Sequence, residues 1–125
     1  MAIEVAGIDH VVINVSDAER AMRWYQKHLG FEPERYGEWL SGKAPFLSMR
    51  VNEVTVIDLL ETDRSGENVD HISFCITGSL EDLATEDVEI VRKFESVYGA
   101  MGWGPALYIR DPDGNVIELK QYSDT

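Results

Sequence analysis

The sequence predicts an α+β protein made of two βαβββ modules related by pseudo-twofold symmetry. The same order of strands and helix occurs twice along the 125 residues, a length that fits one small domain. Two short motifs also recur at almost one offset: Asp9-His10-Val11 as Asp70-His71-Ile72, and Val56-Ile57-Asp58-Leu59 as Val116-Ile117-Glu118-Leu119. Two independent matches at nearly one spacing indicate an internal duplication.

The first module is expected over about residues 6–62. Residues 8–15 are rich in Val and Ile and therefore predict a strand. Ser16 and Asp17 offer an N-cap, and apolar side chains at helical spacing predict a helix over residues 17–28 that Gly30 ends. Residues 31–38 predict a second strand. A hairpin is expected from residues 45–51 and 54–60, with Asn52-Glu53 as its turn.

The second module is expected over about residues 68–122. Its predicted elements are a strand over 69–77, a short helix over 78–86, a strand over 88–97 and a hairpin of 106–110 with 115–121. Asp111-Pro112-Asp113-Gly114 is a strong turn signal between the last two strands. The glycine-rich residues 99–104 are expected to form a loop, either a plain surface connection or a mobile lid that Trp103 closes.

Composition excludes several classes of function. The formal net charge of −12 leaves no basic footprint for nucleic acid or for an anionic membrane surface. No apolar run approaches the ~20 residues of a membrane helix, and the first residues lack the pattern of a signal peptide, so a cytoplasmic location is expected. The single cysteine, Cys75, is expected to be a small buried residue rather than a nucleophile.

The repeated motifs place polar side chains on one face of each predicted sheet. Because side chains alternate along a strand, His10 and His71 point away from the large aliphatic residues, and so do Asp58 and Glu118. Pairing of the two halves would bring the four side chains together. Two imidazoles with one or two carboxylates suit a divalent transition metal that keeps open positions, and zinc, nickel, manganese and iron(II) all fit. Asp58 is one methylene shorter than Glu118, so its place as a fourth ligand stays open.

Several segments resemble the vicinal oxygen chelate superfamily of glyoxalases, bleomycin resistance proteins and extradiol dioxygenases. They are Ile8-Asp9-His10-Val11-Val12, Trp24-Tyr25, Leu29-Gly30-Phe31, Asp70-His71-Ile72 and residues 109–118, of which the Asp-Pro-Asp-Gly-Asn ending is the most specific. The resemblance implies that the paired βαβββ modules form a cupped mixed sheet around a metal site, with metal ligands at His10, His71 and Glu118. In glyoxalase-type members a fourth, acidic ligand lies on the strand of Asp58. The resemblance also implies a small-molecule substrate and a homodimer, with the cleft within one chain or across the interface.

The leading interpretation is a divalent-metal-dependent lyase or isomerase similar to glyoxalase (lactoylglutathione lyase), without an organic cofactor. It would act on a substrate with neighbouring oxygens through an enediolate-type intermediate, with Glu118 as general base and Asp58 as the second candidate. One alternative is a non-haem Fe(II) extradiol-type dioxygenase. Another is a drug-sequestering protein of the bleomycin-resistance type. Candidate cations for an acidic substrate are Arg23, Arg35, Arg50 and Arg110, and candidate proton donors are Tyr98, Tyr108 and Tyr122.

Overall fold

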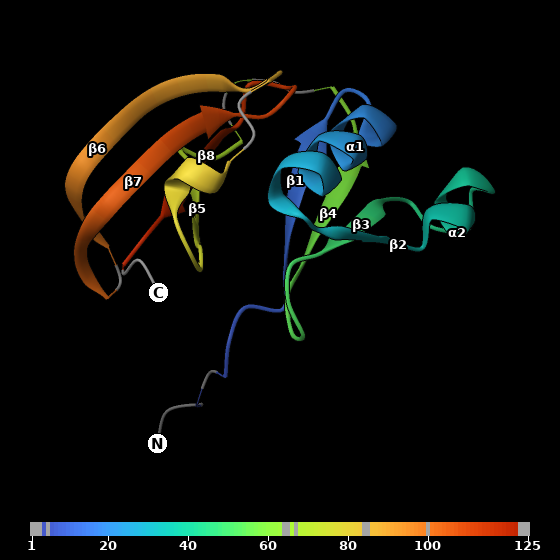
Figure 1. The fold of residues 1–125 in the computed structure, drawn as a ribbon. Coiled ribbons are helices and arrows are strands. Elements are labelled where there is room, and N and C mark those ends of the chain that lie inside the picture. The colour runs from blue at the N-terminus through green and yellow to red at the C-terminus, as the bar shows by residue number, and fades with distance from the viewer. Residues whose placement is uncertain are drawn as a thin grey trace. The chain divides into compact units, whose positions relative to one another are not determined.

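The chain divides into two compact units, Met1–Gly66 and Glu67–Thr125, each of which contains one four-stranded mixed sheet (Figure 1). The computed structural model describes Glu4 and residues 6–63, 66, 68–83, 86–99 and 101–122. The strand order is β1-β4-β3-β2 in the first unit and β5-β8-β7-β6 in the second. Both sheets therefore follow the same path, which confirms the α+β class and the repeated order of strands.

In the first unit a helix packs on one face of the sheet (Figure 1). The elements are β1 (His10–Val15), α1 (Ala18–Leu29), β2 (Glu32–Glu34), α2 (Tyr36–Leu40), β3 (Leu47–Arg50) and β4 (Val56–Glu61). Strand β1 pairs with β4 in parallel, whereas β3 is antiparallel to both of its neighbours.

Helix α1 forms where the sequence predicts it. The side chain of Asp17 accepts a 2.9 Å hydrogen bond from the backbone N–H of Arg20, and Gly30 ends the helix with a φ of 72°. The buried face of the helix contacts β3 and β4. Ile13, Val15, Leu47, Met49, Ile57 and Leu59 form the buried core of this sheet. The polar face of the same sheet is thereby left for His10 and Asp58.

The second unit repeats this plan with different proportions. Its elements are β5 (Ile72–Cys75), the 3₁₀ turn η1 (Leu80–Asp82), β6 (Glu89–Gly99), β7 (Gly102–Arg110) and β8 (Val116–Lys120). Strand β5 is parallel to β8, and the other pairs are antiparallel. Its buried apolar residues within the described part are Leu80, Ala106, Leu107, Ile109, Ile117 and Leu119. Edge strand β6 has 11 residues, whereas its counterpart β2 has three.

Two predicted elements of the first unit are corrected. The strand expected over 31–38 ends at Glu34 because Arg35 has a φ of 62°, and α2 follows at once. The turn expected at Asn52-Glu53 is longer: the backbone N–H of Val51 bonds to the carbonyl of Thr55. The side chain of Asn52 accepts hydrogen bonds from the N–H groups of Val54 and Thr55 and so organises this turn.

Three expectations for the second unit are wrong as well. In place of a helix over 78–86 there is only η1, which follows Gly78 with its φ of 83°; residues 84 and 85 lie outside the described part. The expected loop over 99–104 belongs to two strands, since Gly99 pairs with Gly102 in a tight hairpin; residue 100 is not described. Cys75 is exposed rather than buried, because it alternates with Phe74 onto the polar face.

No helix within the described residues has both the length and the apolar character that crossing a membrane requires.

Candidate functional site

The second unit brings His71 and Glu118 into direct contact. Glu118 lies on β8 opposite Ser73 of β5, two residues beyond His71. The distance from His71 Nε2 to Glu118 Oε1 is 3.2 Å, and the side chain of Glu118 is 8% exposed. On the other side of the ring, Nδ1 of His71 lies 2.6 Å from Oδ1 of Asp70. The imidazole is thus fixed at Nδ1, with Nε2 directed at a carboxylate.

The first unit holds His10 and Asp58 in a related arrangement. Asp58 lies on β4 opposite Val12 of β1, and Nδ1 of His10 lies 2.8 Å from Oδ2 of Asp9. The hydrogen bond with Asp9 raises the pKa of His10; desolvation opposes this rise, and the negative charges of Asp58 and Asp9 add to it. Asp58 is 4% exposed and accepts a 2.6 Å hydrogen bond from Ser48.

The chemistry of both pairs fits a divalent transition metal. A histidine that binds a metal commonly engages its other ring nitrogen with a carboxylate, which fixes the ring and its tautomer. Asp9 and Asp70 provide that contact for His10 and His71 through Nδ1, so Nε2 is the ring nitrogen that could bind a metal. Within the described part of either unit, three His, Cys, Asp or Glu side chains do not gather at one point, so each unit offers a pair of donors.

Tyr108 lies beside the second pair. It faces Glu118 across the β7–β8 ladder, and its ring makes an edge contact with His71 at 5.3 Å between centroids. Burial is the main cause that raises the pKa of Tyr108, and a hydrogen bond to Glu118 and the charge of that carboxylate raise it further. Of the three tyrosines considered as proton donors, this one touches a candidate ligand.

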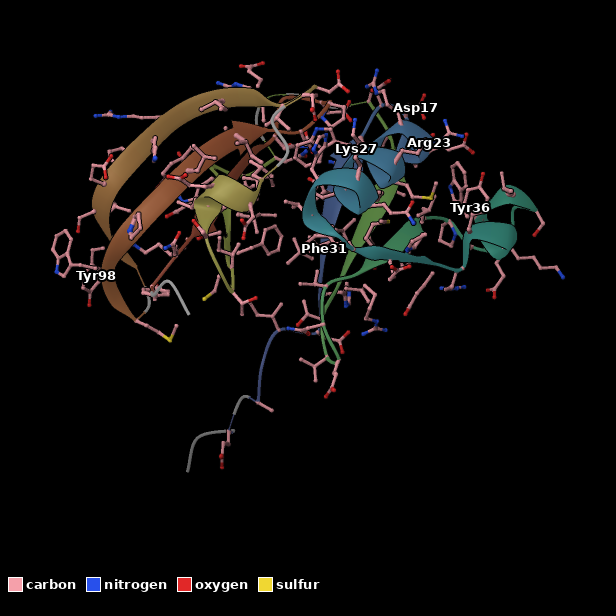
Figure 2. The ribbon with its side chains drawn as sticks, viewed as in Figure 1. Asp17, Arg23, Lys27, Phe31, Tyr36 and Tyr98 are labelled. Carbon is pink, nitrogen blue, oxygen red and sulfur yellow. The ribbon has the colours of Figure 1, made fainter. Side chains whose placement is uncertain are left out.

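The other two tyrosines contact residues of the β6–β7 hairpin. Tyr98 is 67% exposed and packs edge-on against Trp103, at the end of β6 labelled in Figure 2. The hydroxyl of Tyr122 accepts a 3.1 Å hydrogen bond from the backbone N–H of Met101. These contacts hold the hairpin and give neither tyrosine a role at the His–carboxylate pair.

Each arginine considered for an acidic substrate already has a glutamate partner. The pairs are Arg23–Glu19 at 2.8 Å, Arg35–Glu38 at 3.1 Å, Arg50–Glu34 at 2.9 Å and Arg110–Glu89 at 3.0 Å. Figure 2 shows Arg23 with Lys27 on α1. Sequence reasoning missed Ser48, because the turn after β3 is longer than expected and the register of the hairpin is shifted. The observed register places Ser48 opposite Asp58, as it places Tyr108 opposite Glu118.

A comparison with family models finds one match, described as the Glyoxalase/Bleomycin resistance protein/Dioxygenase superfamily, over residues 7–119. Virulence protein STM3117 of Salmonella typhimurium is 32% identical over an alignment of 122 residues, and the match covers 92% of this chain and 83% of that protein. The glyoxalase domain-containing protein RDO1 of Mycosarcoma maydis is 27% identical over 128 residues, covering 98% of this chain and 72% of that protein.

Solved structures with the same fold include an integron cassette protein from the mobile metagenome of V. cholerae. It has a TM-score of 0.78 at 25% identity and covers 98% of this chain and 100% of its own. The fosfomycin resistance protein FosX of Listeria monocytogenes, solved in complex with Mn(II), has a TM-score of 0.69 at 21% identity; the match covers 94% of this chain and 90% of that chain.

Proposed function

Because the chain belongs to the Glyoxalase/Bleomycin resistance protein/Dioxygenase superfamily, we propose that it is a divalent-metal-dependent lyase or isomerase of glyoxalase type. Its substrate would be a small molecule with two neighbouring oxygens. The proposed ligands are His10, His71 and Glu118, with Asp58 as the fourth. The observation that carries this proposal is the repeated pair of a carboxylate and a histidine whose Nδ1 is held by the preceding aspartate.

Zinc, nickel, manganese or iron(II) would suit these donors, and no organic cofactor is invoked. The Mn(II) bound by FosX, a protein of the same fold, supports a divalent ion. When bound, such an ion supplies Lewis-acid stabilisation of negative charge on the substrate oxygens.

The protein's own contribution is proton transfer at Glu118. A carboxylate 3.2 Å from His71 and nearly buried is positioned to take a proton from a carbon next to a carbonyl and to return it to the neighbouring carbon. When the hydroxyl proton of the substrate also passes to the former carbonyl oxygen, the substrate is isomerised without any oxidant or reductant. Tyr108, hydrogen-bonded to Glu118, holds the carboxylate in place, and its ring also contacts the rings of His71 and Phe94. Asp58 is the second candidate base.

Metal binding tests the ligand set directly. We expect elemental analysis of protein purified without added metal to find a divalent ion, and His10→Ala, His71→Ala and Glu118→Gln each to weaken metal binding at least about tenfold. His28→Gln is the matched control, because His28 lies in the last turn of α1. Isomerisation of a hemithioacetal by the nickel or zinc form would support the lyase. Unchanged metal affinity in all three ligand variants would overturn the proposal.

A dioxygenase is the second candidate, and the hydrogen bond from Ser48 to Asp58 favours it. If that contact keeps Asp58 from the metal, the remaining set of His10, His71 and Glu118 is the two-histidine, one-carboxylate triad of Fe(II) oxygenases. Oxygen uptake by the iron form on catechols, without hemithioacetal isomerisation, would replace the lyase with this function. Tight binding of a drug by metal-free protein would instead indicate a sequestering protein.

We also propose a homodimer, which two variants with complementary lesions can probe. His10→Ala damages the first unit and Glu118→Gln the second. If each site combined units from two chains, mixing the variants would restore one intact site in the mixed dimer. If each site lay within one chain, mixing would restore nothing. Sedimentation showing only monomers would exclude the dimer.

A further inference from the structure

A row of four side chains crosses the sheet of the second unit at the level of Glu118. Ser73 of β5 is paired with Glu118 of β8, Glu118 with Tyr108 of β7, and Tyr108 with Arg92 of β6. Side chains that face each other across paired strands lie on the same face of the sheet. Arg92 therefore stands on the same face as the candidate ligand, one strand beyond Tyr108.

A chain of ring contacts connects His71 with Arg92. The ring of Tyr108 meets His71 at 5.3 Å and Phe94 at 5.5 Å between centroids, each at an interplanar angle of 71°. The guanidinium carbon of Arg92 lies 4.3 Å from the centroid of the Phe94 ring. A guanidinium stacked on an aromatic face is oriented by that face while its N–H edge remains free to bind an anion.

Arg92 differs in its charge environment from the other cations near this face. Arg110 is paired with Glu89, and Lys120 is only 2% exposed and donates hydrogen bonds to the carbonyls of Val97 and Gly104. Arg92 is exposed and forms no ion pair with a residue in the described ranges. In a chain with a net charge of −12, an anion needs such a local positive charge in order to bind.

We infer that Arg92 binds an acidic group of the substrate, a carboxylate or a phosphonate or phosphate, and so sets substrate specificity. This inference rests on the proposed function only in placing the reacting oxygens near His71 and Glu118. Strands lie about 4.8 Å apart, so the backbones of β8 and β6 are about 10 Å apart. The acidic group is therefore separated by several bonds from the oxygens that react.

A titration without metal tests the anion site alone. Protein treated with a chelator is titrated with methylphosphonate, and the arginine Nε–H signals are followed by NMR at pH 6. The Arg92 signal is expected to shift and saturate, and the Arg110 signal to stay in place. Arg92→Gln should abolish saturable binding, whereas Lys93→Gln should preserve it, because Lys93 is exposed on the opposite side of the same strand. An unmoved Arg92 signal, or equal weakening by both variants, would overturn the inference.

A second measurement links the anion site to the substrate. Acetohydroxamate and succinic monohydroxamate share a metal-chelating group with two neighbouring oxygens, but only the second carries a carboxylate. With the zinc-loaded protein we expect the carboxylated probe to bind about fivefold more tightly, an advantage that Arg92→Gln removes and Lys93→Gln retains. Equal affinity for both probes in the unmodified protein would refute the assignment of Arg92 to the acidic group of the substrate. It would not contradict the proposed metal site. Failure to bind zinc would refute the proposed function. The methylphosphonate titration would still show whether Arg92 binds an anion.

Discussion

The hydroxyl of Ser48 donates a 2.6 Å hydrogen bond to Oδ1 of Asp58, and both residues are buried. Asp58 has a second oxygen that this bond leaves available. If Asp58 is the fourth ligand, Asp58→Ala should lower metal affinity roughly tenfold, and Ser48→Ala should have a smaller effect through the orientation of the carboxylate. Calorimetric titration with Zn(II) measures both. Wild-type affinity in Asp58→Ala would reduce the ligand set to three residues.

Two tyrosines are expected to lose their phenolic proton at a higher pH than an ordinary tyrosine. A hydrogen bond to Glu19 is the main cause that raises the pKa of Tyr36, and burial is the main cause for Tyr108, so both phenols should ionise above the ordinary value of 10.0. Absorbance of phenolate at alkaline pH measures this. Tyr36→Phe and Tyr108→Phe should each reduce the rise in phenolate absorbance at the high-pH end of the titration curve. If either variant instead lost absorbance at the low-pH end of the curve, the contact assigned to that tyrosine would be contradicted.

Gly104 lies where β7 passes close to the chain after β8. A Cβ at this position would collide with the backbone carbonyl of Gln121, and backbone cannot move aside as a flexible side chain can. Gly104→Ala is expected to lower the free energy of unfolding by about 3 kcal/mol. Gly37→Ala is the control, since nothing lies within 4 Å of a Cβ there and alanine favours α2. Chemical denaturation should separate the two, and equal stability would disprove the collision.

The turn before β8 depends on Asp111. Its carboxylate accepts hydrogen bonds from the backbone N–H groups of Asp113 and Asn115 and from the side chain of Asn115, and it is buried. Asp111→Ala should therefore lower the free energy of unfolding by about 2 kcal/mol. Asn52→Ala, which removes a similar but exposed turn contact, should cost about 0.5 kcal/mol. A larger loss in the Asn52 variant would refute this ranking.

Short strand β2 is tied to β3 by an ion pair that depends on pH. The hydrogen bonds from Arg50 lower the pKa of Glu34, which means that the native state favours the charged carboxylate. The stabilisation is therefore present above the ordinary pKa of 4.5 and is lost as the pH falls through the lowered value. Melting temperatures should show Glu34→Gln less stable than wild type at pH 7, with the gap narrowing as the pH falls below 4.5. A constant gap would show that the pair does not titrate in this way.

Much of the fold could be predicted because local signals agreed with the tertiary structure. Helix α1 has an N-cap at Asp17, an apolar face and a left-handed Gly30, so its ends were fixed by nearby residues. The hairpin before β8 was predicted for the same reason: Asp111 organises the turn through its own side chain. The repeated motifs then supplied the order of the second unit.

The elements that were predicted incorrectly depend on backbone conformations or on strand pairing that composition does not reveal. Arg35 adopts a positive φ, a conformation that non-glycine residues rarely take, and this ends β2 before the end of the predicted strand. Gly99 and Gly102 were interpreted as a flexible segment, but glycine also permits the close pairing of a tight hairpin. In the candidate site, the sequence predicted His10, Asp58, His71 and Glu118, whereas the contact of Ser48 with Asp58 and the position of Arg92 opposite Tyr108 depend on strand register.

The unequal lengths of β2 and β6 bear on how such a duplicated protein diversifies. An edge strand has one neighbour, so β6 can lengthen, bulge or exchange side chains while β5 and β8, which fix His71 and Glu118, keep their register. Selectivity would then evolve in a part of the molecule separate from its reactive groups. Libraries randomised along β6 alone should accordingly yield new ligand preferences in molecules that still fold.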